Sequence, residues 1–393
     1  MHPSEEIYCE KSGKLKGKKI VMGITGSIAA VECFSVIREL IRHGAEVFPV
    51  LTEAASKLVA ADALEFASGH RPVVELTGRT EHIMMMSEAD LLLIFPATAN
   101  TVSKIAMGID DTTVTSMATV AIGSGVPVAI APAMHESMYR NPAVSSNVEK
   151  LKVWGIEFIG PRTDGVRAKV ASKEEVVETA IRMLSGGSLE GMRVLVIGGR
   201  SSEEIDSMRL VTNRSSGRMA VSLATRAYEM GADVELWMGG CDVPLPGYID
   251  TMRFSSVSEL RGMAMDIRHD IVLVPAALAD FTPASKAEGK ISSDSGLDLK
   301  LVPVPKLLPE ISKRCSFVVG FKAESGLGAD ELIAKARSRL ESYGLKAVVA
   351  NDISAAGKDG SSVIFVTKDS ADRIEGSKDE VAEAVLARIA GMI

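Results

Sequence analysis

Two groups of short polar motifs in this chain of 393 residues have the residue types and spacing that proton transfer and phosphate binding require. Most of them follow apolar runs and contain glycine, hydroxyl, amide, histidine or lysine side chains. In the first half the motifs are residues 23–27, His82, 96–100 and 132–138. In the second half they are residues 198–200, 209–217, 276–281, Lys290, 320–324 and 351–352. Neither group is decisive alone, but their order on one chain suggests two consecutive steps of one pathway.

The first motif, Gly-Ile-Thr-Gly-Ser at 23–27, follows an apolar run and precedes a helical pattern. Backbone N–H groups at such a junction can hold a phosphate, and Ser27 adds a hydroxyl donor. The spacing is not GxGxxG, which favours a mononucleotide over a dinucleotide. Tight turns also use glycine for packing, so both interpretations of Gly26 and Ser27 stay open.

The other polar residues of the first half each have a functional and a structural interpretation. His82 can transfer protons near neutral pH, although an isolated histidine is more often a solvated surface residue. Thr98 and Asn100 directly follow a buried apolar run, where they either bind a ligand or cap the next helix. His135, at the end of another apolar run, is a better candidate than Met138, because methionine there is more often packing.

The second half carries a similar set. Residues 209–217, which include Arg209 and Asn213, place hydroxyls, an amide and arginines before a predicted helix, and this combination favours an anion. A helix cap beside a solvated arginine is the alternative. Asp280 could bind a ribose or a Mg²⁺-bound water. Lys290 lies in a loop, where a solvated charge is the default interpretation.

Three further polar or aromatic residues, Phe321, Lys322 and Asn351, also follow apolar runs. The carboxyl ends of parallel strands meet at one edge of a sheet, and ligands bind there. Several strand-end groups at one edge are harder to attribute to packing than any single one.

The apolar pattern predicts the elements that would position these motifs. In the first half it predicts strands at 19–23, 45–51, 90–95, 126–131 and 156–159, and helices at 28–42, 98–107 and 173–184. In the second half it predicts strands at 192–198, 232–238, 270–275, 298–302, 316–321, 345–350 and 363–367, and helices at 217–230, 256–268, 329–343 and 378–393. This alternation predicts two α/β domains, each a doubly wound and mainly parallel sheet. Ser-Gly-Gly-Ser at 185–188 predicts the boundary between a domain of residues 1–186 and a domain of residues 190–393.

Composition excludes several classes of protein. Hydrophobic residues are 46% and charged residues 24%, as in ordinary globular proteins. A net charge of −7 argues against a nucleic-acid surface. The four cysteines have no CxxC spacing, which argues against a zinc site or a disulfide framework. Without a membrane-length apolar stretch or a signal peptide, we expect a cytoplasmic protein with no membrane partner.

The motifs of the first half resemble the flavin-containing cysteine decarboxylases, specifically the phosphopantothenoylcysteine decarboxylases. The family's glycine–serine turn matches residues 23–27, its catalytic histidine matches His82, and its Pro-Ala-Thr-Ala-Asn motif matches 96–100. The motif Pro-x-Met-Asn-x-x-Met matches 132–138, with His135 in place of asparagine. The resemblance implies a flavodoxin-like domain whose FMN-binding residues are Gly26, Ser27, Thr98 and Asn100 and whose substrate-binding residues are His135 and Met138.

One departure from that family concerns a clamp cysteine in an Ala-Cys-Gly segment. The corresponding stretch here, residues 160–171, contains no cysteine. The resemblance implies that FMN oxidises the substrate thiol to a thioaldehyde, that CO₂ then leaves, and that the cysteine protonates the final enethiolate. Without it, Lys169, Arg167 or a water must substitute, or the final reduction is impaired.

The second half resembles the phosphopantothenate–cysteine ligases. Residues 198–217 nearly reproduce the family signature, with Arg200 in place of threonine, and 276–281, 320–324 and 351–352 match further elements. The family's Lys-Ile-Lys-Lys loop keeps only its first lysine, Lys290. The resemblance implies a Rossmann-like domain, CTP as co-substrate and Mg²⁺ with Asp280 as a ligand. It also implies that Lys290 and Asn213 are catalytic, and that the substrate-binding residues are Arg209, Asp280, Phe321, Lys322 and Asn351.

Together the two resemblances imply a bifunctional enzyme of coenzyme A biosynthesis. The second half would join 4′-phosphopantothenate to cysteine through an acyl-cytidylate, and the first half would decarboxylate the product to 4′-phosphopantetheine. Two alternatives stay open: a ligase fused to a domain with lost or altered decarboxylase activity, and a flavin-binding regulatory protein. The resemblance also implies a homo-oligomer, with trimers of the first domain joined by dimers of the second, hence a dodecamer.

Overall fold

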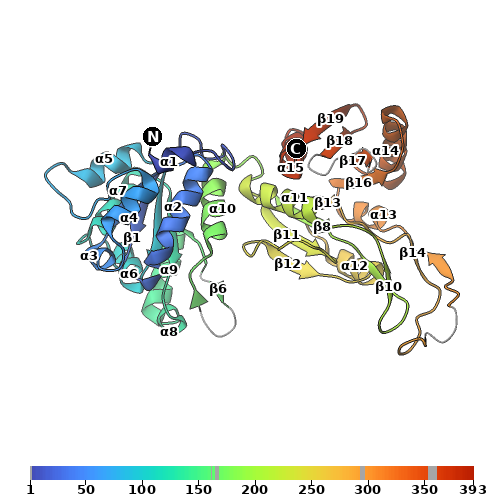
Figure 1. Cartoon of the computed structure of the whole chain (residues 1–393), viewed down its shortest axis with the longest axis horizontal. Helices are drawn as coiled ribbons and strands as arrows, with labels where there is room; N and C mark the ends of the chain where they lie inside the picture. Colours follow the sequence, from blue (N-terminus) through green and yellow to red (C-terminus); the bar gives the residue numbers. More distant parts are fainter. Residues whose placement is uncertain (1, 161, 164–167, 293–296, 353–360) are drawn as a thin grey trace. The chain divides into compact units, whose positions relative to one another are not determined.

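The computed structural model describes residues 2–160, 162–163, 168–292, 297–352 and 361–393 (Figure 1). The chain forms two compact units, Met1–Gly186 and Gly187–Ile393. Across the described residues, no helix combines the length and the apolar character that crossing a membrane requires.

The first unit is built on a five-stranded, fully parallel sheet with the strand order β2-β1-β3-β4-β5. Its strands are β1 Lys19–Ile24, β2 Glu46–Leu51, β3 Leu91–Ala97, β4 Val128–Pro132 and β5 Glu157–Phe158. A short separate ribbon pairs β6 Arg162–Thr163 with β7 Ala168–Lys169. The central strand β3 is buried along its whole length, as parallel strands covered on both faces are.

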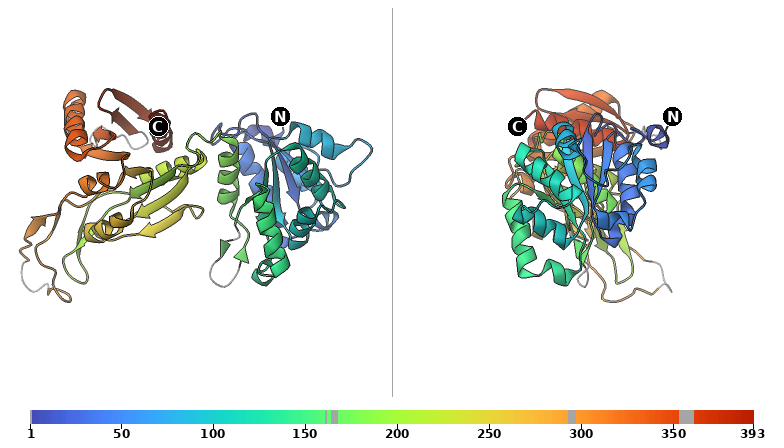
Figure 2. Two further views of the ribbon diagram at one scale, coloured as in Figure 1. Left: turned by 180° about the vertical axis from the view of Figure 1, so that it is seen from behind. Right: turned by 90° about the vertical axis from the view of Figure 1, so that its left-hand side faces the viewer.

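Helices cover both faces of this sheet. They are α1 Pro3–Glu6, η1 Ile28–Glu32, α2 Cys33–Arg42, α3 Glu53–Ser56, α4 Ala61–Ser68, α5 Glu81–Glu88, α6 Ala99–Met107, α7 Thr113–Ser124, α8 Glu136–Tyr139, α9 Pro142–Val153 and α10 Lys173–Leu184. One face packs against α2, α4 and α10, and the other against α5, α6, α7 and α9. Figure 2 shows these two layers on either side of the strands, and Figure 1 shows α2 beside α10.

The second unit contains an eight-stranded sheet with the order β12-β11-β8-β13-β16-β17-β18-β19. Its strands are β8 Arg193–Gly198, β11 Asp233–Met238, β12 Asp250–Arg253, β13 Ile271–Val274, β16 Val318–Glu324, β17 Ala347–Asp352, β18 Ser361–Val366 and β19 Ala371–Gly376. The strands from β12 to β17 are parallel, whereas β18 and β19 are antiparallel additions. One face packs against α11 and α15, and the other against α12, α13 and α14. The helices are α11 Arg218–Glu229, α12 Val257–Met263, η2 Ala264–Asp266, α13 Leu308–Ser312, α14 Ala329–Tyr343 and α15 Lys378–Ala390.

Two antiparallel ribbons complete the second unit. They pair β9 Ser202–Glu204 with β10 Leu210–Thr212, and β14 Phe281–Pro283 with β15 Leu301–Pro303. The predicted strand at 298–302 therefore begins later and belongs to a ribbon instead of the main sheet.

The two α/β units confirm the predicted fold class, and the helix predicted at 173–184 has the observed bounds of α10. The single helix predicted at 28–42 is instead divided into η1 and α2. Its first turn is 3₁₀, because the N–H of Ala30 bonds to the carbonyl of Ser27 and the Ser27 hydroxyl accepts from Ala29.

A buried carboxylate, Glu39 on α2, joins three segments of the first unit. Its side chain is 8% exposed and pairs with Lys11, with Arg42 at 3.2 Å and with Lys173 on α10 at 3.9 Å. Burial alone would raise the pKa of Glu39, but the hydrogen bond and charge of Lys11, the charge of Lys173 and the hydrogen bond of Arg42 together hold it below its ordinary value. The ionised form of Glu39 therefore stabilises the fold.

We expect Glu39→Gln to lower the free energy of unfolding of the first unit by about 2 kcal/mol at neutral pH, because it removes the buried negative charge that Lys11, Arg42 and Lys173 share. Since the folded pKa is depressed, the contribution is complete above the unfolded pKa and is lost as the pH falls through the folded pKa. Urea unfolding at neutral and acidic pH measures it. A difference between the variant and the wild type that does not shrink in acid contradicts this account.

Candidate active sites

Hydrogen bonds bring the glycine–serine turn of the first unit to the loops that follow β3 and β4. The buried hydroxyl of Thr25 donates to the carbonyl of Pro96 at 2.7 Å and accepts from the N–H of Thr98 at 3.0 Å. The N–H of Ala133 donates to the carbonyl of Ala97 at 2.8 Å. The predicted motifs at 23–27, 96–100 and 132–138 therefore meet at the carboxyl edge of one sheet, as expected for a doubly wound fold.

Close packing explains the glycine at position 26, and the turn nevertheless remains accessible to a ligand. A Cβ atom on Gly26 would lie 2.6 Å from the Cβ of Ala54, so close approach of the chain explains this glycine. The hydroxyl of Ser27 caps η1 and lies 3.5 Å from the carbonyl of Ala133. Gly26 is exposed and Ser27 is half-buried, so a ligand can still reach both.

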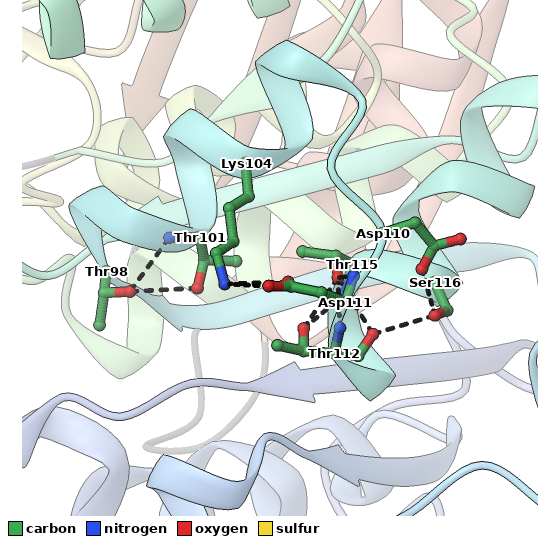
Figure 3. Close-up of polar contacts among 8 residues, drawn as sticks. All are labelled: Thr98, Thr101, Lys104, Asp110, Asp111, Thr112, Thr115 and Ser116. Atoms are coloured by element: carbon green, nitrogen blue, oxygen red, sulfur yellow. Dashed lines mark hydrogen bonds and ion pairs between the residues drawn. The ribbon is translucent and has the colours of Figure 1, made fainter.

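The segment after β3 is held by a network on α6 and α7 (Figure 3). Thr98 is the N-cap of α6: its hydroxyl accepts from the N–H of Thr101 at 3.3 Å. Lys104 on α6 pairs with Asp111 at 2.7 Å. Asn100 lies exposed on the first turn of α6. The structural interpretation of Thr98 therefore holds, and Asn100 faces solvent at the predicted ligand edge.

Asp111 belongs to a segment that sequence reasoning missed. Asp110 accepts from the hydroxyl of Ser116, and Thr112 forms a reciprocal capping box with Thr115 at the start of α7 (Figure 3). The spacing of Thr112 and Thr115 was the available signal, because such pairs mark helix starts.

His82 lies in the first turn of α5 with a buried, unsatisfied ring nitrogen. Its Nδ1 atom has no hydrogen-bond partner among the described residues. The other end of α5 is fixed at the amino end of β1, where Lys19 pairs with Glu88 at 2.6 Å. Helix α5 packs against β1, and its last residue, Glu88, lies beside the first residue of that strand. The first turn of α5, which contains His82, therefore lies toward the carboxyl edge of the sheet. A buried polar nitrogen without a partner fits a site that a ligand completes.

His135 is the N-cap of α8, a position where asparagine is favoured. Its Nδ1 atom accepts from the N–H of Ser137 at 3.2 Å and lies 2.8 Å from the Ser137 hydroxyl. The histidine thus makes a cap bond that asparagine could make. Since Nδ1 accepts, Nε2 carries the proton and can donate to a ligand. Met138 is 48% exposed and is therefore not core packing.

Of the predicted substitutes for the clamp cysteine, Arg167 lies outside the described residues, and Lys169 is described only as part of the backbone of β7.

The second unit contains a cavity of about 600 Å³ at the carboxyl ends of its strands. The predicted site residues that line it are Asn213, Asp280, Phe321, Lys322 and Asn351. The other charged residues of its lining are Arg214, which belongs to the motif at 209–217, and Lys306, Arg339 and Lys378, which sequence reasoning missed. Their cations make the cavity suited to a polyanion. No motif marked Lys306, Arg339 and Lys378, because they come from segments far apart in the sequence.

Asn213 and Arg200 fix the loop of residues 213–217, which joins β10 to α11 at one wall of this cavity. The amide of Asn213 donates to the carbonyls of Ala277 at 3.3 Å and Leu278 at 2.9 Å. Arg200 pairs with Asp242 at 2.8 and 2.9 Å and donates to the carbonyl of Ser215 at 2.5 Å. Its guanidinium holds the pKa of Asp242 below the ordinary value. Arg200, which replaces a threonine of the family signature, therefore ties the loop to the end of β11.

Among the described residues, Asp280 is the only acidic side chain in the lining of this cavity. Asp280 forms an ion pair with Lys306, and Lys322 pairs with Glu324 at 2.8 Å. The described residues include no group of three or more side chains that could hold a metal ion. Mg²⁺ commonly keeps several waters and binds through one or two carboxylates plus substrate phosphates. A single carboxylate such as Asp280 is compatible with that mode.

The remaining predicted residues, Arg209 and Lys290, do not line this cavity. Arg209 instead pairs with Asp206 at 2.6 Å and donates to the carbonyl of Ile291 at 3.1 Å. Lys290 is exposed on the neighbouring loop. Their roles at the site stay predictions.

Comparison with known proteins identifies both units. Residues 9–185 match the Flavoprotein family, and residues 189–392 match the DNA/pantothenate metabolism flavoprotein C-terminal domain. The coenzyme A biosynthesis bifunctional protein CoaBC of Thermococcus kodakarensis is 46% identical over 407 residues, which cover 100% of each chain. The protein of the same description from Methanocaldococcus jannaschii is 39% identical over 402 residues, covering 100% of this chain and 98% of that protein. The crystal structure of the DNA/pantothenate metabolism flavoprotein from Streptococcus pneumoniae is 23% identical, covers 52% of this chain and 100% of that chain, and has a TM-score of 0.47.

Proposed function

Because this chain belongs to the family of coenzyme A biosynthesis bifunctional proteins, we propose that its two units divide the two reactions of that family. The enzyme is a phosphopantothenate–cysteine ligase and a phosphopantothenoylcysteine decarboxylase. In our proposal residues 190–393 carry out the ligation, and residues 1–186 decarboxylate the ligation product.

For the decarboxylase, the residues at the carboxyl edge of the first unit fit FMN, which would supply the oxidation of the substrate thiol. Gly26, Ser27, Thr98 and Asn100 would hold the cofactor. His82 would move a proton at the substrate, and its buried Nδ1 atom, which has no hydrogen-bond partner among the described residues, supports this role. His135 would donate from Nε2 to the carboxylate or amide of the substrate, beside the exposed Met138.

For the ligase, the cation-rich cavity of the second unit fits CTP with Mg²⁺ at its phosphates. The carboxylate of 4′-phosphopantothenate would attack the α-phosphate, and pyrophosphate would leave. Lys290 would neutralise charge on the transferring phosphorus, and Asn213 would hold the acyl-cytidylate for attack by the amine of cysteine. Asp280, Phe321, Lys322 and Asn351 would bind the nucleotide, with Asp280 next to the metal ion.

The observation that carries the ligase assignment is the convergence of Asn213, Asp280 and Lys322, with other predicted residues, on one cavity. The test combines the purified protein with FMN, 4′-phosphopantothenate, cysteine, CTP and Mg²⁺ and follows the products by mass spectrometry. Accumulation of 4′-phosphopantetheine is expected. Accumulation of 4′-phosphopantothenoylcysteine would instead show a ligase whose first unit has lost or altered its decarboxylase, and no product would contradict both assignments.

We also propose that the first unit assembles with copies of itself, as trimers that dimers of the second unit join into a dodecamer. Apolar side chains exposed on η1 and the neighbouring helices support this. Ile28 is 76% exposed and Val31 59%, and the rings of Phe34 and Phe66 stack at 6.2 Å beside them. An apolar group of this kind is typical of a protein–protein contact.

A further inference from the structure

The carboxylate of Asp206, between β9 and β10, is fully buried and accepts hydrogen bonds from several donors. One oxygen accepts from the N–H groups of Met208 and Arg209, both at 2.7 Å. The other accepts from the guanidinium of Arg209 at 2.6 Å and from the N–H of Ile291 at 3.1 Å. The N–H of Met208, with the other donors, lowers the pKa of Asp206 to about 2. The group is therefore an anion throughout the physiological range.

These bonds join two segments that lie more than 80 residues apart in the sequence. The guanidinium of Arg209 also donates to the carbonyl of Ile291 at 3.1 Å, so the backbone of Ile291 is held at both its N–H and its carbonyl. The N–H of Ser207 adds a bond to the carbonyl of Gly289 at 3.4 Å. Figure 1 shows β10 and β14 at the same end of the second unit. Lys290 thus lies between two residues whose backbone is fixed by the turn at 206–209.

We propose that Asp206 is a positioning residue of the ligase, which fixes the backbone of Ile291 and thereby places the side chain of Lys290 for acyl-cytidylate formation. The inference rests on the role proposed above for Lys290. It also gives Arg209 a function away from the nucleotide cavity, as the second half of this attachment.

The chemistry of the attachment requires a carboxylate. Among the described residues, the groups that hydrogen-bond to the carboxylate of Asp206 are all donors: three backbone N–H groups and one guanidinium. An asparagine of the same size would turn its own NH₂ toward one of these donors, which leaves two donors facing each other in a buried position. Asp206→Asn should therefore release the loop with little change in shape or volume.

The experiment compares Asp206→Asn with the wild type and with Asp298→Asn, a matched variant at an exposed aspartate beyond the loop. Limited trypsin digestion followed by mass spectrometry measures cleavage after Lys290. Cleavage of a transiently opened segment follows the population of the open state, so we expect it to be on the order of 10- to 100-fold faster in Asp206→Asn. Cleavage after the exposed Lys300 should not change. Pyrophosphate release with CTP and 4′-phosphopantothenate should slow by a similar factor.

The outcomes separate two claims: that Asp206 holds the loop, and that this attachment places Lys290 for the reaction. Cleavage after Lys290 at the wild-type rate in Asp206→Asn would show that the carboxylate does not hold the loop. Faster cleavage with unchanged pyrophosphate release would refute the positioning role. If Asp206→Asn does not fold, Arg209→Met serves instead, because it leaves the backbone donors in place. Cleavage after Lys290 should then be faster than in the wild type, by a smaller factor than expected for Asp206→Asn. An unchanged cleavage rate in Arg209→Met would overturn the proposal. A wild type that releases no pyrophosphate would contradict the ligase function, while the digestion still tests the attachment.

Discussion

Replacement of Lys290 by glutamine is expected to slow pyrophosphate release by a factor of roughly 100 to 1,000, the cost of removing one charge-stabilising donor from a transition state. The ammonium group of Lys290 would offset negative charge that grows on the transferring phosphorus. Glutamine has a similar length but no charge. The measurement is the rate of pyrophosphate release with CTP and 4′-phosphopantothenate at saturating concentrations.

A neighbouring lysine provides the control. Lys286 lies in the same segment and forms a surface ion pair with Glu204, so Lys286→Gln should change the rate by less than about threefold. Decarboxylation of supplied 4′-phosphopantothenoylcysteine should be unchanged in both variants. Equal pyrophosphate release in Lys290→Gln and the wild type would show that the loop lysine is misassigned. The cations that line the cavity, Lys306 among them, would then be the candidates.

The sequence predicted the fold well because short apolar runs mark parallel strands that are buried on both faces. Strand β3, for example, is apolar almost throughout and has no exposed position. Elements whose sequences are less regular were missed. Helix α7 is an instance: it consists mostly of small and hydroxyl-bearing residues, so its sequence lacks a clear apolar periodicity, and only the local Thr112–Thr115 capping box marks its start.

The candidate site was predictable where it depends on the strands and not where it depends on tertiary contacts. Asp280 follows β13 and Asn351 lies at the end of β17; the carboxyl ends of these strands must meet at one edge, and both residues line the cavity. Arg339 and Lys378 lie on helices, and nothing in their local sequence indicates that they face the same cavity. The attachment of Arg209 to Ile291 depends on a pairing across the loop, which spacing along the chain does not reveal.

Replacement of His82 by asparagine is expected to lower the rate of CO₂ release by a factor of roughly 100 to 10,000, the usual contribution of a general acid or base. Asparagine keeps a polar group of similar size in the first turn of α5, but it cannot take up and return a proton at neutral pH. Ligation should continue at the wild-type rate, so 4′-phosphopantothenoylcysteine should accumulate. The measurement is CO₂ release from supplied 4′-phosphopantothenoylcysteine.

A histidine at another helix start serves as the control for this substitution. His2 is the N-cap of α1 and bonds to Ser4 at 2.8 Å, so His2→Asn keeps the cap bond and should leave both activities intact. The visible absorbance of bound flavin separates chemistry from cofactor loss, since His82→Asn should retain it. Because the Nδ1 atom of His82 is buried and without a partner among the described residues, no hydrogen bond of that atom within the described protein explains its place on α5. A His82→Asn variant that still releases CO₂ at the wild-type rate would therefore remove His82 from the mechanism and leave that buried nitrogen without a function.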